Sequence, residues 1–177
     1  ATTVFQLVES MDAGPIFDTE HHEVSTDSTS GQVLSSLAEL GARQVIRVLG
    51  GIERGVLEAR EQVGTPTFAP KLTTKDARLD VRDDVVELFN LFRAVTPEPG
   101  AWIDTTAGRV KISAAAPRIS TGEVPLGTIV EHDGVAVLGC TSGALELHLV
   151  TPAGKREMSG SEWLRGIRSH DVSVVHP

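Results

Sequence analysis

The longest amphipathic pattern in the sequence lies in residues 26–54. A helical period of three and four residues predicts one long helix over this range. Ser28 or Thr29 can accept a hydrogen bond from the first turn, and Gly55 follows Arg54, where a helix commonly ends. The apolar positions that carry the period are Val33, Leu34, Leu37, Leu40, Ala42, Val45, Ile46, Leu49 and Ile52.

Two short strand-like runs precede this helix. Residues 3–9 are rich in β-branched and aromatic side chains, and residues 16–24 alternate imperfectly between apolar and polar. The intervening residues 10–15 include Gly14-Pro15, a strong breaker of regular structure. The pattern therefore predicts a strand-loop-strand unit that pairs across the loop.

Residues 61–75 show no hydrophobic period and contain two prolines and four threonines. Such a segment is typical of an extended linker. We therefore expect a domain boundary here, with one unit over residues 1–60 and a second over residues 76–177.

The second unit begins with a helix over residues 83–94, capped by Asp83 or Asp84 and stopped by the Pro97–Gly100 segment. Short strands with glycine turns follow at residues 101–105, 109–114, 127–132, 134–139 and 144–150. Their spacing predicts a small barrel or sandwich. Residues 159–162 have the spacing of a capping box and open a helix at 163–168, after which residues 170–177 are expected to be loose.

Length and composition are those of a globular protein. The chain has 177 residues, 40% of them hydrophobic and 23% charged, which suits one ordinary domain or two small ones and argues against disorder. A single cysteine excludes an intramolecular disulfide and fits a cytoplasmic protein. No apolar run reaches the roughly 18 residues of a membrane span. Because Ala1 opens directly into a strand-like run, we expect a fragment or a processed product.

The formal charge is −8, which argues against strong non-specific binding of nucleic acid. Residues 1–70 carry 4 basic and 10 acidic groups, whereas residues 71–177 carry 12 basic and 14 acidic groups. Residues 71–177 are therefore nearly balanced in charge, which allows a local basic face there, although a solvated surface of mixed charge is the simpler interpretation.

Few side chains point to chemistry by their pattern alone. His21 and His22 are adjacent on a predicted strand and point to opposite faces, so no metal site is expected. Cys140 is predicted to be a small buried side chain rather than a reactive thiol. Asp12 lies before small residues in the 10–15 loop, where an aspartate often bonds turn amides.

Five segments, in order, resemble the methionyl-tRNA formyltransferase family. They are TTVFQLVESMDAGPIF, TSGQVLSSLAELGARQVIRVLGGIERG, PTFAPKLTTKDARLD, FRAVTPEPGAW and PAGKREMSGSEWLRG. The resemblance covers almost the whole chain. It implies an α+β fold, in which the strand-loop-strand unit and long helix end a Rossmann-like formyltransferase domain, followed by a small OB-like β-barrel domain.

The resemblance also implies an activity and a catalytic residue. The family transfers a formyl group from 10-formyltetrahydrofolate to the amino group of methionyl-initiator tRNA in translation initiation, without a metal. Asp12 occupies the position of the family's aspartate in the motif matched by SMDAGPI, where it joins an Asn and a His. Those two residues are expected upstream of Ala1, so this chain alone is predicted to be inactive.

The partner implied is initiator tRNA charged with methionine, held partly by the second domain. A monomer in the cytoplasm, without membrane contact, is expected. The basic residues expected to meet phosphate are Lys155, Arg156, Lys71, Lys75, Arg78, Arg109 and Lys111.

Two other interpretations remain open at this point. The chain could be a stand-alone RNA-binding OB-like module, or part of a related formyltransferase that acts on a nucleotide-sugar amine. An upstream segment with an Asn-x-His pair would favour the transferase, and the PAGKREM segment favours the tRNA enzyme over the sugar enzyme.

Overall fold

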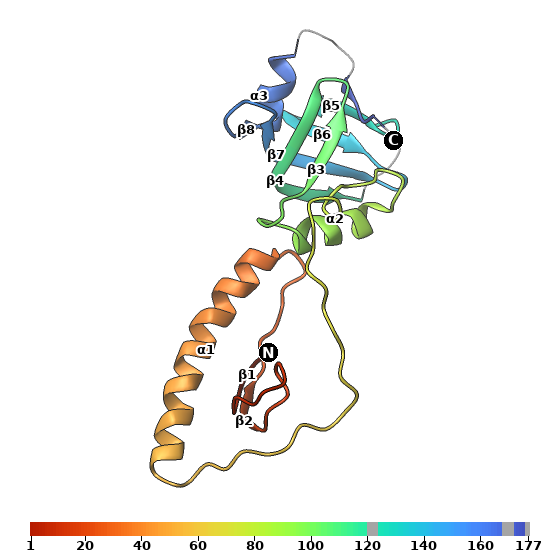
Figure 1. The fold of residues 1–177 in the computed structure, drawn as a ribbon. Coiled ribbons are helices and arrows are strands. Elements are labelled where there is room, and N and C mark those ends of the chain that lie inside the picture. The colour runs from red at the N-terminus through yellow and green to blue at the C-terminus, as the bar shows by residue number, and fades with distance from the viewer. Residues whose placement is uncertain (120–123, 168–171, 176–177) are drawn as a thin grey trace. The chain divides into compact units, whose positions relative to one another are not determined.

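The computed structural model describes residues 1–119, 124–167 and 172–175. Its contacts divide the chain into a first unit, Ala1–Pro70, and a second unit, Lys71–Pro177. The division falls within the segment expected to be a linker. The elements of both units are labelled in Figure 1.

The first unit consists of a two-stranded antiparallel sheet and one long helix. Strands β1 (Thr2–Phe5) and β2 (Ile16–Glu20) pair with Thr2 opposite Glu20, and helix α1 (Ser30–Glu53) contacts both strands. This confirms the predicted strand-loop-strand-helix order. Both strands are shorter than the sequence predicts, because the ladder becomes irregular after Val4 and residues 7–13 leave it as a loop.

A capping box fixes the start of α1. The Thr29 side chain accepts from the Gln32 backbone N–H, and the Gln32 Oε1 accepts from the Thr29 N–H at 2.8 Å. Of the two caps that the sequence allows, Thr29 is therefore the one used, and the residues before it lie outside the helix. Two of the four orphan N–H groups at a helix start are satisfied in this way.

One side of α1 packs on the sheet through polar as well as apolar contacts. Gln44, Val48 and Gly51 are buried there, and Gln44 Nε2 donates to Asp18 Oδ2 at 3.1 Å. Arg47 Nη2 lies 2.9 Å from the same carboxylate oxygen, which lowers the pKa of Asp18. Hydrogen bonds from Gln44 and Arg47 to Asp18 thus join α1 to β2, in addition to the burial of apolar side chains.

The other side of α1 has no partner within the first unit. Five large apolar side chains there are 40–73% exposed, namely Leu34, Val45, Ile46, Leu49 and Ile52. They form what we call the exposed apolar side of α1. A contiguous exposed apolar surface on a helix is typical of a face that another part of a protein covers.

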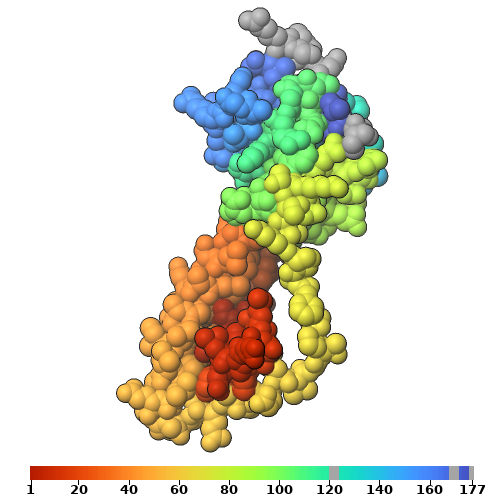
Figure 2. All heavy atoms as spheres, in the orientation of Figure 1, coloured from red at the N-terminus to blue at the C-terminus, as the bar shows by residue number. Residues whose placement is uncertain are grey.

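The segment that follows α1 is extended. The backbone of Arg60 pairs with that of Ile16, and residues 61–70 then run without regular structure. Figure 2 shows this segment as a narrow file of atoms, and its Val63 and Phe68 are 99% and 93% exposed. The two large apolar side chains of this aperiodic, proline-containing segment are thus left almost fully exposed.

The second unit contains an antiparallel sheet with the order β3-β4-β7-β6-β5-β9, to which β8 adds beside β7. The sheet closes on itself, because Thr105 bridges Val174, Thr106 N donates to Ser173 O at 2.8 Å, and Val175 N donates to Asp104 O at 2.8 Å. The result is a barrel. Its strands are β3 (Trp102–Thr105), β4 (Gly108–Arg118), β5 (Thr128–His132), β6 (Val135–Gly139), β7 (Ala144–Pro152), β8 (Met158–Ser159) and β9 (Val172–Ser173).

Two helices pack outside the barrel (Figure 1). Helix α2 (Val85–Ala94), capped by Asp84, buries its apolar side against β4 and β7, and helix α3 (Gly160–Arg165) begins with the predicted capping box between Ser159 and Glu162. The apolar residues of α2, the inward positions of the strands and Trp163 form one core. Among the described residues, no helix is long and apolar enough to cross a membrane.

The expectation that residues 170–177 are loose is wrong for residues 172–175. Residues 172–173 form β9, and the backbone of residues 173–175 closes the barrel against β3. A two-residue strand carries no readable period, so only its tertiary hydrogen bonds reveal it. Residues 168, 170–171 and 176–177, which belonged to the predicted helix end and tail, lie outside the described residues.

Gly160→Ala should destabilise the second unit. A Cβ at this position would lie 2.2 Å from Leu147 O and 2.8 Å from Ala136 Cβ. Overpacking of this kind costs about 1–3 kcal/mol, so thermal unfolding should show a Tm lowered by at least about 4 °C. Gly166→Ala is the matched control, because its Cβ would meet backbone oxygens at an ordinary 3.4 Å. An equal Tm for the two variants would contradict the proposed packing.

Candidate functional site

The loop between β1 and β2 carries Asp12 and is held by three backbone contacts. Gln62 Nε2 donates to both Asp12 O and Gly14 O at 2.8 Å, and Gln6 N donates to Pro15 O at 2.8 Å. Gly14 is required sterically, because a Cβ there would lie 1.7 Å from Gln6 O. Sequence reasoning did not identify the role of Gln62, which lies 50 residues from Asp12 in the chain.

Asp12 itself has a φ of 53°, in the left-handed region where aspartate is enriched. Asp12 is exposed, and its carboxylate makes no hydrogen bond or ion pair within the described part of the chain. The turn-amide contact that the loop sequence suggested is therefore not formed. An exposed carboxylate on a fixed loop can accept a hydrogen bond from an imidazole N–H and so set its tautomer.

A second arrangement lies on the outer face of β3 and β4. Ile103 and Val110 are paired and fully buried, so the alternate positions face outward. Those outward positions are Trp102 opposite Lys111 and Asp104 opposite Arg109.

Trp102 is the centre of this arrangement. The Arg109 Cζ lies 3.7 Å from the ring centroid, and the Arg78 Cζ lies 5.6 Å from it. Both distances are within the range of cation–π attraction. The indole Nε1 donates to Thr74 O at 2.6 Å, so that the outward-facing ring is only 7% exposed. We call Arg78, Trp102, Asp104 and Arg109 the Trp102 cluster.

The carboxylate of Asp104 completes the cluster. Arg109 Nε donates to Asp104 Oδ1 at 2.9 Å and Arg109 Nη2 donates to Oδ2 at 3.2 Å. These hydrogen bonds, with a smaller effect from the charge of Arg78, lower the pKa of the Asp104 carboxyl. Both side chains are therefore ionised at neutral pH, and the Asp104 carboxylate holds the Nε–Nη2 edge of the Arg109 guanidinium.

The turn that carries Lys155 and Arg156 is hydrogen-bonded to β4 through its backbone, and hydrogen bonds from Ser159, helped by the charge of Arg156, lower the pKa of Glu162. Ala153 N donates to Arg109 O at 3.0 Å, and Lys155 N donates to Pro152 O at 3.0 Å, which places the exposed turn after β7 beside the start of β4. Thr74 O touches Trp102, so its neighbour Lys75 belongs to this region as well. Lys71 is exposed at the start of the second unit, and no contact joins it to the others among the described residues.

Cys140 is buried, as the sequence predicts. Burial raises the pKa of its thiol to about 11, so it is not a thiolate at neutral pH. Among the described residues no group of three or more His, Cys, Asp and Glu side chains could hold a metal ion.

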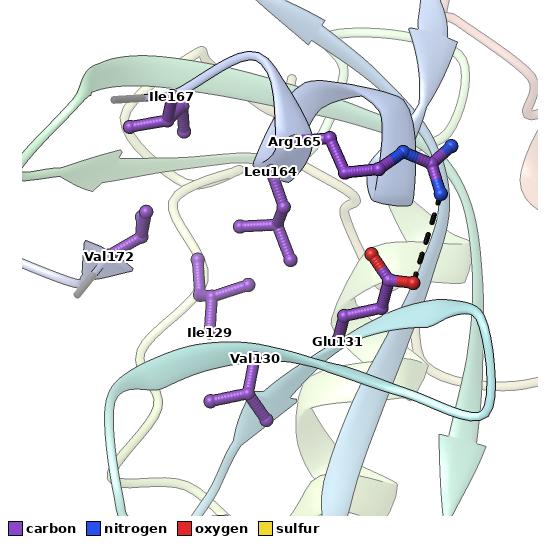
Figure 3. Close-up of a pocket in the computed structure, with 7 residues that line it drawn as sticks. All are labelled: Ile129, Val130, Glu131, Leu164, Arg165, Ile167 and Val172. Atoms are coloured by element: carbon purple, nitrogen blue, oxygen red, sulfur yellow. Dashed lines mark ion pairs between the residues drawn. The ribbon is translucent and has the colours of Figure 1, made fainter. Parts of the chain in front are cut away.

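The second unit also has a cavity of about 360 Å³ between β5, β9 and α3 (Figure 3). Its lining is largely apolar, with Ile129, Leu164 and Val172 gathered in it. At one side Arg165 Nη1 lies 3.8 Å from Glu131 Oε1, so the two charges of the rim are paired with each other.

Comparison with known families identifies the second unit. Residues 71–168 match the family model described as formyl transferase, C-terminal domain. The chain therefore belongs to this formyl transferase family. Most of the second unit, including the Trp102 cluster and the 153–156 turn, lies within the matched range.

The relatives with curated names extend the similarity to the first unit. A methionyl-tRNA formyltransferase of Clavibacter michiganensis is 37% identical over 97% of this chain, and one of Leifsonia xyli is 42% identical over 92% of it. The matches cover 56% and 54% of those proteins. The chain thus spans about half the length of the curated relatives it matches.

Solved structures share the fold at lower identity. HypX from Aquifex aeolicus has a TM-score of 0.74 with 19% identity, over 93% of this chain and 31% of that chain. An N-formyltransferase from Helicobacter canadensis, solved with folinic acid and dTDP-3-aminofucose, has a TM-score of 0.62 with 14% identity, over 82% of this chain and 54% of that chain.

Gln62→Ala should loosen the loop that carries Asp12. The variant removes two hydrogen bonds to the loop backbone, each worth about 0.5–1.5 kcal/mol. Amide hydrogen exchange of Gln6, whose N–H donates to Pro15 O across the base of the loop, should therefore become at least about fivefold faster, while that of α1 stays the same. Glu61→Ala, at the exposed neighbouring position, is the control. Unchanged exchange in Gln62→Ala would show that this side chain does not hold the loop.

Proposed function

We propose that this chain is the C-terminal portion of a methionyl-tRNA formyltransferase, which transfers a formyl group from 10-formyltetrahydrofolate to methionyl-initiator tRNA. The observation that carries the proposal is the 37–42% identity, over more than nine-tenths of the chain, to the C-terminal part of proteins with that name. The sugar-modifying neighbours share only the fold, at 14% identity, which gives the nucleotide-sugar alternative less support.

Residues 1–60 are then the end of a Rossmann-like catalytic domain, residues 61–75 a linker, and residues 76–177 an OB-like tRNA-binding domain. The exposed apolar side of α1 supports the first assignment, since a helix with five exposed large apolar residues fits the interior of a larger domain. The closed antiparallel barrel supports the last one, since OB-folds are small barrels that bind nucleic acids.

Asp12 is the catalytic residue that this chain contributes. Its carboxylate orients the imidazole of a histidine and raises the basicity of that ring, which then removes a proton from the attacking amine. The fixed loop backbone serves this role, because an orienting group must hold its position within a fraction of an ångström.

The formyl donor supplies the activated one-carbon group. We place the binding of the folate in the part of the relatives that this chain does not match. HypX was solved in complex with tetrahydrofolic acid, which fits a folate donor in this fold family. A cytoplasmic monomer remains our prediction.

The chain alone should show no formyl transfer, because no His or Asn among the described residues contacts the Asp12 carboxylate. Joined behind the unmatched portion of the Clavibacter michiganensis relative, it should transfer formyl to methionyl-initiator tRNA. In that chimaera Asp12→Asn should lower kcat/KM on the order of 10²–10⁴-fold, as loss of an orienting carboxylate does in hydrolytic triads.

Glu9→Gln, which removes another exposed carboxylate near the same loop, is the control for charge. An Asp12→Asn chimaera as active as its parent would reduce Asp12 to a turn residue. Turnover by the chain alone would contradict the assignment of the remaining catalytic residues.

The cations around Trp102 and the 153–156 turn are the proposed tRNA contacts. Arg109, Lys111, Lys155 and Arg156 are exposed, and the first two lie on the same outer face. With 12 basic and 14 acidic groups in residues 71–177, we expect only about two to four phosphate contacts. Binding should therefore be weak and steeply dependent on salt.

Lys155→Glu with Arg156→Glu should weaken binding of initiator and elongator tRNAs alike, because phosphate contacts carry no sequence information. The salt slope should shrink by about 0.7–0.9 for each phosphate that the variant no longer neutralises, measured by titrations at three salt concentrations. Arg43→Glu with Arg54→Glu makes the same change in net charge on α1 and at its C-cap. Equal effects of the two double variants would mean that net charge alone governs binding.

A further inference from the structure

The guanidinium of Arg109 is held on two sides before any ligand arrives. Its face stacks on the Trp102 ring at 3.7 Å, and its Nε–Nη2 edge is taken by the Asp104 carboxylate at 2.9 and 3.2 Å. The cross-strand pairing of Asp104 with Arg109, with Trp102 one diagonal step away, produces this geometry.

One edge of the guanidinium remains available. The Arg109 Nη1 hydrogens and the second hydrogen of Nη2 have no partner among the described residues, and the side chain is 51% exposed. Arginine has two edges that can each meet an oxyanion bidentately. With the Nε edge occupied, the Nη1–Nη2 edge keeps the spacing that fits two phosphate oxygens.

We propose that Asp104 and Trp102 are positioning residues that fix the free edge of Arg109 for contact with RNA phosphate. This inference rests on the proposed function, tRNA binding by the second unit. Binding normally has to order an exposed arginine side chain, at a cost in conformational entropy. Here the fold orders Arg109 before RNA binds, so that this cost is reduced. The nearby Arg78 and Lys111 add positive charge to the same face.

A positioning role of Asp104 and a purely electrostatic role predict opposite changes in RNA affinity when the Asp104 charge is removed. Asp104 is an acidic group beside the proposed RNA contacts, so its removal should tighten binding if only charge mattered. If it positions Arg109, Asp104→Asn should instead weaken binding about three- to tenfold. Arg109→Lys keeps the charge but removes the planar fork, and it should weaken binding to a similar degree.

Asp133→Asn is the matched control. Asp133 is exposed, pairs with Arg118 at 3.5 Å, and has a φ of 53° that asparagine accepts equally well. Arg118 is the last residue of β4 and Arg109 the second, so the two are roughly 25–30 Å apart for nine residues of strand. The variant removes one carboxylate from an arginine partner, as Asp104→Asn does, without touching the Trp102 cluster.

Binding of unacylated initiator tRNA to the full chain and to the three variants should be titrated at fixed salt. The free proteins should be compared by the ¹⁵N heteronuclear NOE of the Arg109 Nε–H, identified by its disappearance in Arg109→Lys. We expect an ordered Nε–H in the wild type and in Asp133→Asn, and a disordered Nε–H together with weaker binding in Asp104→Asn.

An unchanged Nε–H in Asp104→Asn, or tighter RNA binding by that variant, would overturn the positioning role while leaving tRNA binding intact. A wild-type chain that binds no tRNA at all would overturn the proposed function and this inference with it. Equal melting curves of Asp104→Asn and Asp133→Asn establish that unfolding is not the cause.

Discussion

The barrel of the second unit closes where Val175 N donates to Asp104 O and Thr106 N donates to Ser173 O. This closure joins the two ends of the sheet by pairing the backbone of residues 104–106 with that of residues 173–175. The same contacts hold two residues of the Trp102 cluster. Asp104 lies in the closing strand β3, and Arg78 Nη2 donates to Val175 O. The backbone contacts that complete the barrel are therefore continuous with the side chains that surround Trp102.

The first unit depends on a different balance. Polar contacts between Gln44, Arg47 and Asp18 join α1 to β2, while the exposed apolar side of the helix finds no cover within residues 1–70. A unit with so few buried side chains gains little from the hydrophobic effect by itself. The Asp12 loop shares this dependence on specific contacts, since Gly14 and Gln62 hold it rather than a core.

Membership in the formyl transferase family and the barrel architecture connect the two units to one proposed enzyme. The loop of the first unit presents a carboxylate with no internal partner among the described residues, and the second unit presents cations on an outer sheet face. The two surfaces differ in purpose. In our proposal, the first surface acts on the reacting atoms through a histidine. The second surface would contact a phosphate backbone, which requires charge and geometry but no catalytic group.

Local sequence signals determined the long helix, its cap near Thr29, the capping box of α3 and the five strands at 101–150, because periodicity and caps act over neighbouring residues. The sequence also contained the positions of Asp104 and Arg109, and pairing the two predicted strands as a hairpin could have brought them together. Only the tertiary structure decided the rest: β9, the hold of Gln62 on the Asp12 loop, and the stacking of Arg109 on Trp102. Each joins residues through contacts between elements, and no short-range pattern encodes a contact made by folding.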